Sequence, residues 1–364
     1  MTYNNINNNF KKAQLKKAQL KKAQLKKAFS LIELSVVVLI IGILIAGITS
    51  GSRLVRNSKL ASAAQLTKSS DVNSIPDLVL WLEPTQENSF ATTSGNTDTL
   101  TYANVAGLQD SAYVKDTLRP DNREYVARWN DISPRAVAGN KKSVYQETGS
   151  RRPMYIANAI NGLPALQFNG TSQYIYSQNN NTTPSAPPLV AGDDTFTVIA
   201  VFSNSNNTAS TNEGQTIMNQ FTGTFGIDYR EAPMWLYNYN NLSWSMWGPG
   251  SPMYSGLKAN FNDNHIAVVK IEDKAILPTN NLMFYLNTSP LFPNTAFSNS
   301  QNLDSSVYNV SDAMFTIGGR SLATVDYLFK GYIGEVMVFD RALKNEELDV
   351  IMKYLSKKWG IALK

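Results

Sequence analysis

The sequence predicts a mainly β protein, in which an antiparallel β-sandwich follows a long N-terminal helix and is closed by an amphipathic C-terminal helix. Three observations lead to this prediction. An apolar run occupies residues 29–48, short β-rich runs fill the chain from about residue 77, and apolar residues recur at helical spacing after residue 344. Successive strands without intervening helices are typical of antiparallel sandwiches.

The first 28 residues form a basic leader that repeats the pentapeptide KKAQL three times and contains eight lysines and no acidic residue. A five-residue repeat advances by about 140° net around a helix, so the repeated leucines share no face. We therefore expect a solvated cytoplasmic tail. The leader alone makes the chain basic, because the body has 25 basic and 28 acidic residues, and no nucleic-acid partner is predicted.

The predicted helix covers residues 29–70, and its apolar part spans Phe29–Ile48. Twenty helical residues extend about 30 Å, which is enough to cross the hydrocarbon core of a membrane. The leader lysines outnumber the cations that follow the apolar run, which predicts a cytoplasmic N-terminus and an exported C-terminus. The expected location is the inner membrane, with the C-terminal domain in the periplasm or, after assembly, at the cell surface. A polar linker at residues 71–76 would end with Pro76.

The β domain is expected to occupy residues 77–362. The closing helix is expected to start at a capping Asn345 and to stop at Gly360. Asn-Gly pairs at 161–162 and 169–170 predict turns that need positive φ angles. The predicted strands are residues 77–83, 125–129, 165–170, 174–177, 194–203, 224–229, 234–240, 265–272, 282–287, 313–319 and 331–340.

The composition restricts the chemistry that the chain can perform. It has no Cys, so disulfides and thiolate metal sites are excluded. His265 is the one histidine, so a Ser-His-Asp triad would have to use it. We expect His265 at a loop or strand edge.

Glu33 lies near the start of the apolar run, where burying a carboxylate in lipid costs several kcal/mol. From physics alone, it is either a functional residue or a residue that reaches headgroup water beside Lys26 and Lys27. The stretch KKAFSLIELSVVVLIIGILIAG decides between them, because it resembles the leader and N-terminal helix of type IV prepilins and pseudopilins.

The resemblance implies cleavage between Ala28 and Phe29 by prepilin peptidase and N-methylation of Phe29. It also implies that Glu33 pairs with the N-terminal amine of a neighbouring pilin or pseudopilin subunit. Most relatives have Gly where this chain has Ala28, which is also small. The competing interpretation is a secretory signal peptide, cleaved near residues 46–50.

The β domain resembles bacterial laminin-G-like, concanavalin A-like jelly rolls. The resemblance rests on LVLWLE (78–83), RWNDIS (128–133), NGLPALQFNG (161–170), DTFTVIAVF (194–202), FTIGGR (315–320) and GYIGEVMVFDRAL (331–343). It implies a sugar or protein ligand. Some relatives cut glucans with a Glu-x-Asp-x-Glu strand. This sequence lacks that motif, and its nearest counterpart, EELD at 346–349, falls in the closing helix. The chain is therefore expected not to be an enzyme.

An aromatic-rich stretch, residues 233–254, is the candidate ligand platform. Its candidate binding residues are Trp235, Tyr237, Trp244 and Trp247. The competing interpretation, which we favour, places these aromatics in the core. Asp131 and the pair Asp193 and Asp194 are candidates for calcium, as in some relatives, although turn and surface roles are favoured. No other metal or cofactor is predicted.

Together these features predict a membrane-anchored minor subunit of a type IV pilus, or a pseudopilin of a type II secretion or DNA-uptake system. Its large exported domain would serve in adhesion or binding. The alternative is a glycan-binding, less favourably a glycan-cleaving, jelly-roll protein that uses the N-terminal segment only as an anchor or signal peptide.

Overall fold

The computed structural model describes residues 12–16, 31–86, 89–90 and most of 125–364. The parts of 125–364 that it leaves undescribed are 135–141, 147, 178, 181–182, 185–187, 190–194, 207–213, 222–229, 238–240, 248–252, 273–281, 289, 291–313 and 320–326. The predicted strand at 224–229 lies outside the described residues.

The chain divides into two compact units, Met1–Asn57 and Ser58–Lys364. The long helix α2 (Leu31–Lys68) crosses this division. The C-terminal end of α2 is part of the second unit, which therefore begins before the predicted linker at 71–76. The linker itself contains a 3₁₀ helix, η1 (Asp71–Ser74), capped by the Ser70 side chain, which accepts a hydrogen bond from the Val72 N–H at 3.2 Å.

One antiparallel sheet of the second unit has seven strands in the order β15-β14-β9-β17-β5-β4, and β1 also pairs with β17. Its strands are β1 (Leu78–Leu82), β4 (Met154–Ile160), β5 (Leu163–Asn169), β9 (Phe196–Asn204), β14 (His265–Ile271), β15 (Leu282–Leu286) and β17 (Lys330–Phe339). The turn between β4 and β5 confirms the prediction for Asn161 and Gly162, whose φ angles are 47° and 85°.

The other antiparallel sheet has eight strands in the order β13-β12-β11-β10-β16-β6-β3-β2. Its strands are β2 (Arg128–Trp129), β3 (Val144–Tyr145), β6 (Ile175–Tyr176), β10 (Gly214–Phe221), β11 (Arg230–Tyr237), β12 (Asn241–Trp247), β13 (Met253–Lys258) and β16 (Met314–Ile317). A separate short pair joins β7 (Asn179–Asn180) to β8 (Thr183–Pro184). The mainly β, antiparallel class that the sequence predicts is thus confirmed.

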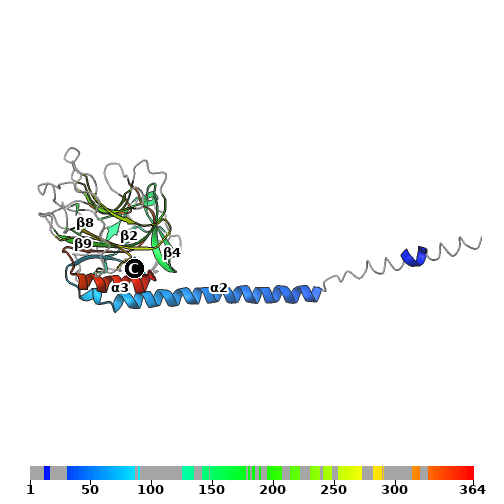
Figure 1. Cartoon of the computed structure of the whole chain (residues 1–364). Coiled ribbons are helices and arrows are strands. Elements are labelled where there is room, and N and C mark those ends of the chain that lie inside the picture. Colours follow the sequence, from blue (N-terminus) through cyan, green and yellow to red (C-terminus); the bar gives the residue numbers. More distant parts are fainter. Residues whose placement is uncertain are drawn as a thin grey trace, which may run out of the picture. The chain divides into compact units, whose positions relative to one another are not determined.

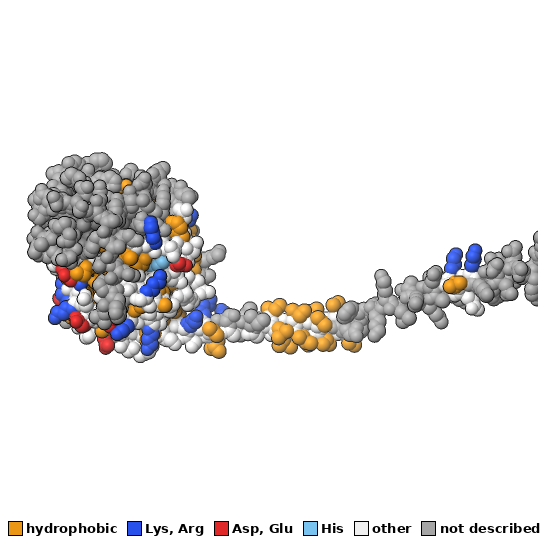
Figure 2. All heavy atoms as spheres, in the orientation of Figure 1, with side chains coloured by type: hydrophobic (Ala, Val, Ile, Leu, Met, Phe, Trp, Pro, Cys, Tyr) orange, Lys and Arg blue, Asp and Glu red, His pale blue; other side chains and the backbone are white. Residues whose placement is uncertain are grey.

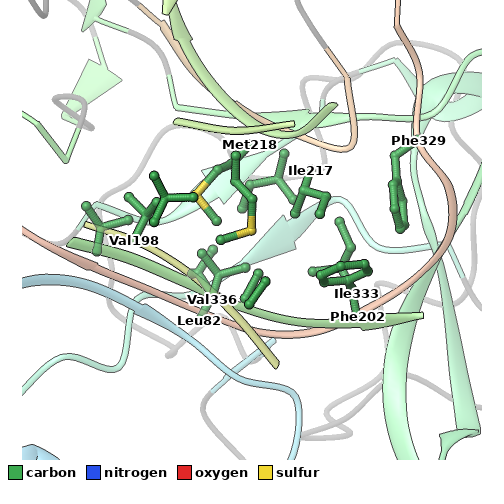
Figure 3. Packing of buried hydrophobic residues seen from close by; sticks show 14 of the residues in the cluster. Leu82, Val198, Phe202, Ile217, Met218, Phe329, Ile333 and Val336 are labelled. Carbon is green, nitrogen blue, oxygen red and sulfur yellow. The ribbon is translucent and has the colours of Figure 1, made fainter. Parts of the chain in front are cut away.

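The main core lies between the two sheets (Figure 3). Val198 and Phe202 of β9 and Val336 of β17 face Ile217 and Met218 of β10, and all five are buried. Burial of such side chains is worth roughly 1.5–3 kcal/mol each relative to exposure. This interdigitation is what holds one sheet against the other.

A second core lies on the opposite face of the seven-stranded sheet, under helix α3 (Asn345–Trp359) (Figure 1). The predicted apolar face of this helix is confirmed by its buried side chains, Leu348, Ile351, Met352, Leu355 and Trp359. Ala63 from the C-terminal end of α2 joins the same cluster. The seven-stranded sheet is therefore covered on both faces, and every residue of β9 and β14 is buried.

The predicted start of α3 is wrong by one residue, because Lys344 is the N-cap and Asn345 is the first helical residue. The carboxylate of Glu347 replaces the expected Asn cap by accepting a hydrogen bond from the Lys344 N–H at 2.9 Å. Arg341 holds Glu347 in place with two guanidinium hydrogen bonds of 2.8 Å. The predicted stop is confirmed, since Gly360 has a left-handed φ of 62° and its N–H donates to the Ser356 carbonyl.

His265 is the first residue of β14, which agrees with the expected strand edge, but its side chain is buried. Its Nε2 lies 2.9 Å from the Asn260 carbonyl oxygen. Burial lowers the pKa of His265, against the opposing effects of this hydrogen bond and Asp263. The ring therefore belongs to the packing of the strand end.

The contact between α3 and β17 gives a prediction for Gly334. A Cβ there would lie 2.6 Å from Trp359 Cη2, so Gly334→Ala forces an indole in the second core to move. We expect a loss of about 1–3 kcal/mol in the free energy of unfolding, measured by urea denaturation. Gly47→Ala is the control, since nothing lies within 4 Å of its added Cβ. Equal stability of the Gly334→Ala protein and the wild type would contradict this packing.

Candidate functional site

The N-terminal candidate site combines the processing residues with the first turn of α2. Ala28 and Phe29 lie outside the described residues. Glu33 is the third residue of α2, and its side chain is not described. In the same turn, Ser35 Oγ donates a hydrogen bond of 2.8 Å to the Ile32 carbonyl, which satisfies its hydroxyl within the helix.

The described side chains of residues 31–47 are all exposed. Figure 2 shows one side of this segment, where hydrophobic side chains predominate. They are mostly large and apolar, and examples are Leu31 at 86% exposure, Ile32 at 73% and Ile43 at 63%. A surface helix of a globular domain normally has one polar face, and this segment has none.

Within the part of the chain that the structure describes, no helix combines the length and the apolar character needed to cross a membrane.

The second candidate site is a buried ion cluster in the second unit, which we define as Glu83, Glu335 and Lys358. Lys358 Nζ on α3 lies 2.7 Å from Glu83 Oε2 and 2.9 Å from Glu335 Oε2. All three side chains are at most 1% exposed. Lys358 also donates to Thr67 Oγ1 at 2.8 Å, so the cluster reaches the last turn of α2.

Glu335 is surrounded by aromatic hydrogen-bond donors. Its Oε1 accepts from Trp81 Nε1 at 2.7 Å and from the Tyr354 hydroxyl at 2.9 Å, and its Oε2 accepts from Trp359 Nε1 at 2.8 Å. The indoles of β1 and α3 thus meet at a carboxylate on β17. Buried Trp and Tyr side chains need such partners for their polar atoms.

Glu83 follows β1 and organises the chain immediately after it. Its carboxylate accepts hydrogen bonds from the N–H groups of Thr85 and Gln86, at 3.0 and 2.6 Å, and from Ser89 Oγ at 3.0 Å. The Gln86 side chain in turn donates to the Ala64 carbonyl on α2 at 2.7 Å. The cluster therefore joins the end of α2 to β1, β17 and α3.

The electrostatics of the cluster favour its charged form. Burial alone would raise the pKa of Glu83, but the charge and hydrogen bond of Lys358, together with the Thr85 hydrogen bonds, lower it below 4.5. Burial alone would lower the pKa of Lys358, but Glu335 and Glu83 raise it above 10.5. Burial and the same two carboxylates raise the pKa of Tyr354 well above 10. These groups are buried and mutually paired, which suits a structural junction.

The predicted aromatic platform is only partly described. The backbones of Trp235 and Tyr237 belong to β11, and those of Trp244 and Trp247 belong to β12, which pairs with β11. Their side chains lie outside the described residues, and ligand binding by them remains a prediction.

The candidate calcium residues are also only partly described. Asp131 is buried, and its carboxylate accepts hydrogen bonds from the Trp81, Ser133 and Lys142 N–H groups and from Ser133 Oγ. Asp193 and Asp194 lie outside the described residues. Among the residues that are described, no three His, Asp or Glu side chains form a group that could hold a metal ion. Calcium binding remains untested.

Sequence analysis missed the ion cluster. The available signals were a carboxylate inside the otherwise apolar run of residues 331–339 and a lysine beside Trp359 on the apolar helix face. Each of these is a charge at a position where the periodicity predicts core. The sequence does not show that such charges from distant segments meet.

A family model described as the prokaryotic N-terminal methylation motif matches residues 24–49. This confirms the predicted prepilin-type segment, which includes Ala28, Phe29 and Glu33. The chain therefore carries a pilin-like N-terminal motif. No curated protein matches the chain.

Three solved structures to which the chain is similar are the following. Trypanosoma rangeli sialidase with 2,3-difluorosialic acid has 12% identity and a TM-score of 0.45, and the match covers 85% of this chain and 39% of that one. The binding domain of Paraclostridial Mosquitocidal Protein 1 has 12% identity and a TM-score of 0.43, with 64% and 52% covered. Domain 4 of an extracellular arabinanase from Geobacillus stearothermophilus, in complex with arabinotriose, has 14% identity and a TM-score of 0.35, with 54% and 79% covered. The chain spans about half or less of the first two proteins.

The expectation that the chain is not an enzyme is overturned. It rested on the absence of a Glu-x-Asp-x-Glu strand, but the similar solved structures include sialidases. The absence of one glucanase motif therefore does not exclude enzymatic activity. At 12–14% identity and TM-scores below 0.5, these structures assign no activity to this chain either.

The ion cluster gives a prediction for Lys358→Met, which keeps a long unbranched side chain and removes its charge. Two buried carboxylates then lose their cation, and we expect a loss of about 3–5 kcal/mol in the free energy of unfolding. Urea denaturation followed by tryptophan fluorescence measures it. The matched control is Lys353→Met on the same helix, where a 69% exposed lysine pairs with Asp349 and the expected change is below about 0.5 kcal/mol. Equal effects of the two variants would contradict the role of the cluster.

The lowered pKa of Glu83 gives a prediction for pH. Because its folded-state pKa lies below 4.5, its contribution to stability is complete above that pH and is lost as pH falls through the folded-state value. The difference in unfolding free energy between wild type and Glu83→Gln should therefore be constant near neutral pH and shrink in acid. A difference that grows as the pH falls would show that the sign is wrong.

Proposed function

We propose that this protein is an exported, pilin-like minor subunit of a type IV pilus or of a type II secretion or DNA-uptake pseudopilus. In this proposal its β-sandwich unit is displayed outside the inner membrane for adhesion or binding. The observation that carries the proposal is the methylation motif at 24–49 on a helix that exposes apolar side chains on every side.

The motif supports processing by prepilin peptidase between Ala28 and Phe29, followed by methylation of the new N-terminus. The proposed anchor is Phe29–Ile48, which begins before the described helix and rests on the sequence and the motif. Removal of the basic leader would leave an apolar helix that begins with a positively charged amine. Glu33 would then be four residues from that amine.

Glu33 is proposed to pair with the N-terminal amine of a neighbouring subunit. A carboxylate among apolar helices needs a partner charge, because an unpaired buried charge is strongly destabilising. The exposed residues of 31–47 would pack against the equivalent helices of other subunits. The same surface thus has two apolar environments in turn, the lipid before assembly and the fibre afterwards.

The ion cluster supports a role for the second unit as a displayed head. Through buried charges it joins the C-terminal end of α2 to β17, α3 and the residue that follows β1. The last turn of α2 is therefore bound to the head by a hydrogen bond from Lys358 to Thr67. A subunit that carries a load outside the membrane needs a joint of this kind. The size of the head favours a minor subunit over a major pilin.

Glu33→Ala separates assembly from processing. We expect the variant to be inserted and cleaved like the wild type, and both proteins to begin with methylated Phe29 when their intact mass is measured after isolation from the native host. Because the variant lacks the carboxylate that pairs with the amine, we expect its recovery in sheared fibres to fall by about tenfold or more. Ser35→Ala, two residues further along the same helix, is the matched control.

Two results would overturn the proposal. A wild-type chain that begins near residue 50 would identify a secreted sandwich whose N-terminal segment is a signal peptide. A chain that retains residues 1–28 would identify an unprocessed anchor. Normal incorporation of the Glu33→Ala protein would remove the proposed role of this carboxylate even if processing occurs at Phe29.

A further inference from the structure

The ion cluster places a primary amine directly against two carboxylates in a closed interior. Lys358 Nζ lies 2.7 Å from Glu83 Oε2 and 2.9 Å from Glu335 Oε2. The side chains of Lys358 and Glu83 are both 0% exposed. An amine and a carboxylic acid are the two groups that condense to an amide. The cluster therefore contains both reactants of a covalent cross-link, held at hydrogen-bond distance.

Positioning and burial both favour this condensation. Two groups fixed in contact react as if their concentration were about 10⁵–10⁸ M, because folding has already removed the entropy of bringing them together. The ionised pair predominates before the reaction, and the pH dependence of Glu83 applies to this state. The reaction proceeds from the minor neutral form, in which one proton has passed from Lys358 Nζ to Glu83 Oε2 across their 2.7 Å hydrogen bond. Because the resulting amide is neutral, the bond also removes two buried charges, which are costly in an interior.

Glu83 has the surroundings of the carboxyl group that is attacked. Its Oε1 accepts hydrogen bonds from the Gln86 N–H at 2.6 Å and from Ser89 Oγ at 3.0 Å. Negative charge develops on this oxygen when the carboxyl carbon becomes tetrahedral, and the two donors stabilise it as those of an oxyanion hole do. The other oxygen, Oε2, lies beside Lys358 Nζ and is the one that departs as water.

Glu335 has the surroundings of a base that is fixed in place. Its Oε2 lies 2.9 Å from Lys358 Nζ, which is within reach for proton transfer. Trp81 Nε1 and the Tyr354 hydroxyl donate hydrogen bonds to its Oε1, and Trp359 Nε1 donates to its Oε2. These three neutral donors still satisfy the Glu335 carboxylate after the charge of the lysine has gone.

We propose that Lys358 and Glu83 form an intramolecular isopeptide bond, with Glu335 as the base that moves the proton. Nζ gives one proton to Glu83 Oε2, and its lone pair then forms the N–Cδ bond while the C=O electron pair moves to Oε1. Glu335 takes a second proton from the nitrogen and returns it to the Oε2 hydroxyl. The Cδ–Oε2 bond breaks with its electron pair, the double bond to Oε1 re-forms, and water leaves. An ammonium and a carboxylate thus become an amide and one water, and Glu335 is ionised as at the start.

The bond would close the head between its two chain ends. Glu83 follows β1, the first strand after α2, and Lys358 lies in α3, 275 positions further on. A load that enters the head through α2 would separate β1 from β17 only as far as Glu83, where the covalent bond transfers the load to α3. This mechanical consequence rests on the proposed function, whereas the bond itself does not.

The test is the intact mass of the protein, isolated in detergent from its native host and measured after denaturation. We expect the wild type to be lighter by one water than its sequence and its N-terminus require, and its digest to contain one branched peptide joined through Glu83 and Lys358. Lys358→Arg keeps the buried positive charge but has no primary amine, so we expect it to have the full mass. Lys353→Arg changes an exposed lysine of the same helix and is the matched control, which should still lack one water.

Glu335→Gln tests the role of the base. The amide of this variant cannot take up the proton from the nitrogen, so we expect the rate of bond formation in newly synthesised protein to fall about 100-fold or more. The rate is followed as the fraction of protein that has lost water. Circular dichroism checks that all three variants are folded.

Three results would overturn the proposal. They are a wild-type mass without loss of water, a loss of water that persists in Lys358→Arg, and a loss of water located elsewhere than at Glu83 and Lys358. An unchanged rate in Glu335→Gln would overturn the role of Glu335. None of these measurements depends on cleavage at Phe29 or on fibre incorporation, so a failure here is distinguishable from a failure of the proposed function.

Discussion

The second unit depends on a single buried lysine. Lys358 carries its charge into the interior, and only the simultaneous presence of Glu83 and Glu335 compensates for the loss of water around it. These residues, with Thr67, come from four elements, and Thr67 and Glu83 are distant in the sequence from Lys358. The Lys358 ammonium has all of these partners only when the four elements are packed together. The cluster therefore links correct folding of the β-sandwich to correct docking of the end of α2.

This constraint explains the layered arrangement. Because α3 and the end of α2 are held against the seven-stranded sheet, that sheet is covered on both faces, and β9 and β14 have no exposed residue.

Features of the fold that depend on neighbouring residues could be predicted from the sequence. Features that depend on contacts between distant residues could not. The Asn161–Gly162 turn follows from backbone sterics, and the face of α3 follows from its period, so both could be predicted. The N-cap was misplaced because Glu347, held by Arg341, satisfies the N-terminus in place of an Asn side chain. Strands β3, β4, β10, β12 and β13 were missed. Pairing with neighbouring strands stabilises them, and pairing is not a local property.

The sequence by itself determined the N-terminal segment, because the order of a basic leader, a small residue, Phe29, an apolar run and Glu33 lies within one contiguous stretch. It also determined the mainly β class, through the period and punctuation of its strands. Only the tertiary structure decided that Glu83, Glu335 and Lys358 form one cluster with Thr67 at the end of α2. The reason is physical: strand register and helix docking bring together residues that are up to 291 positions apart, as Thr67 and Lys358 are. No local periodicity encodes such a distance.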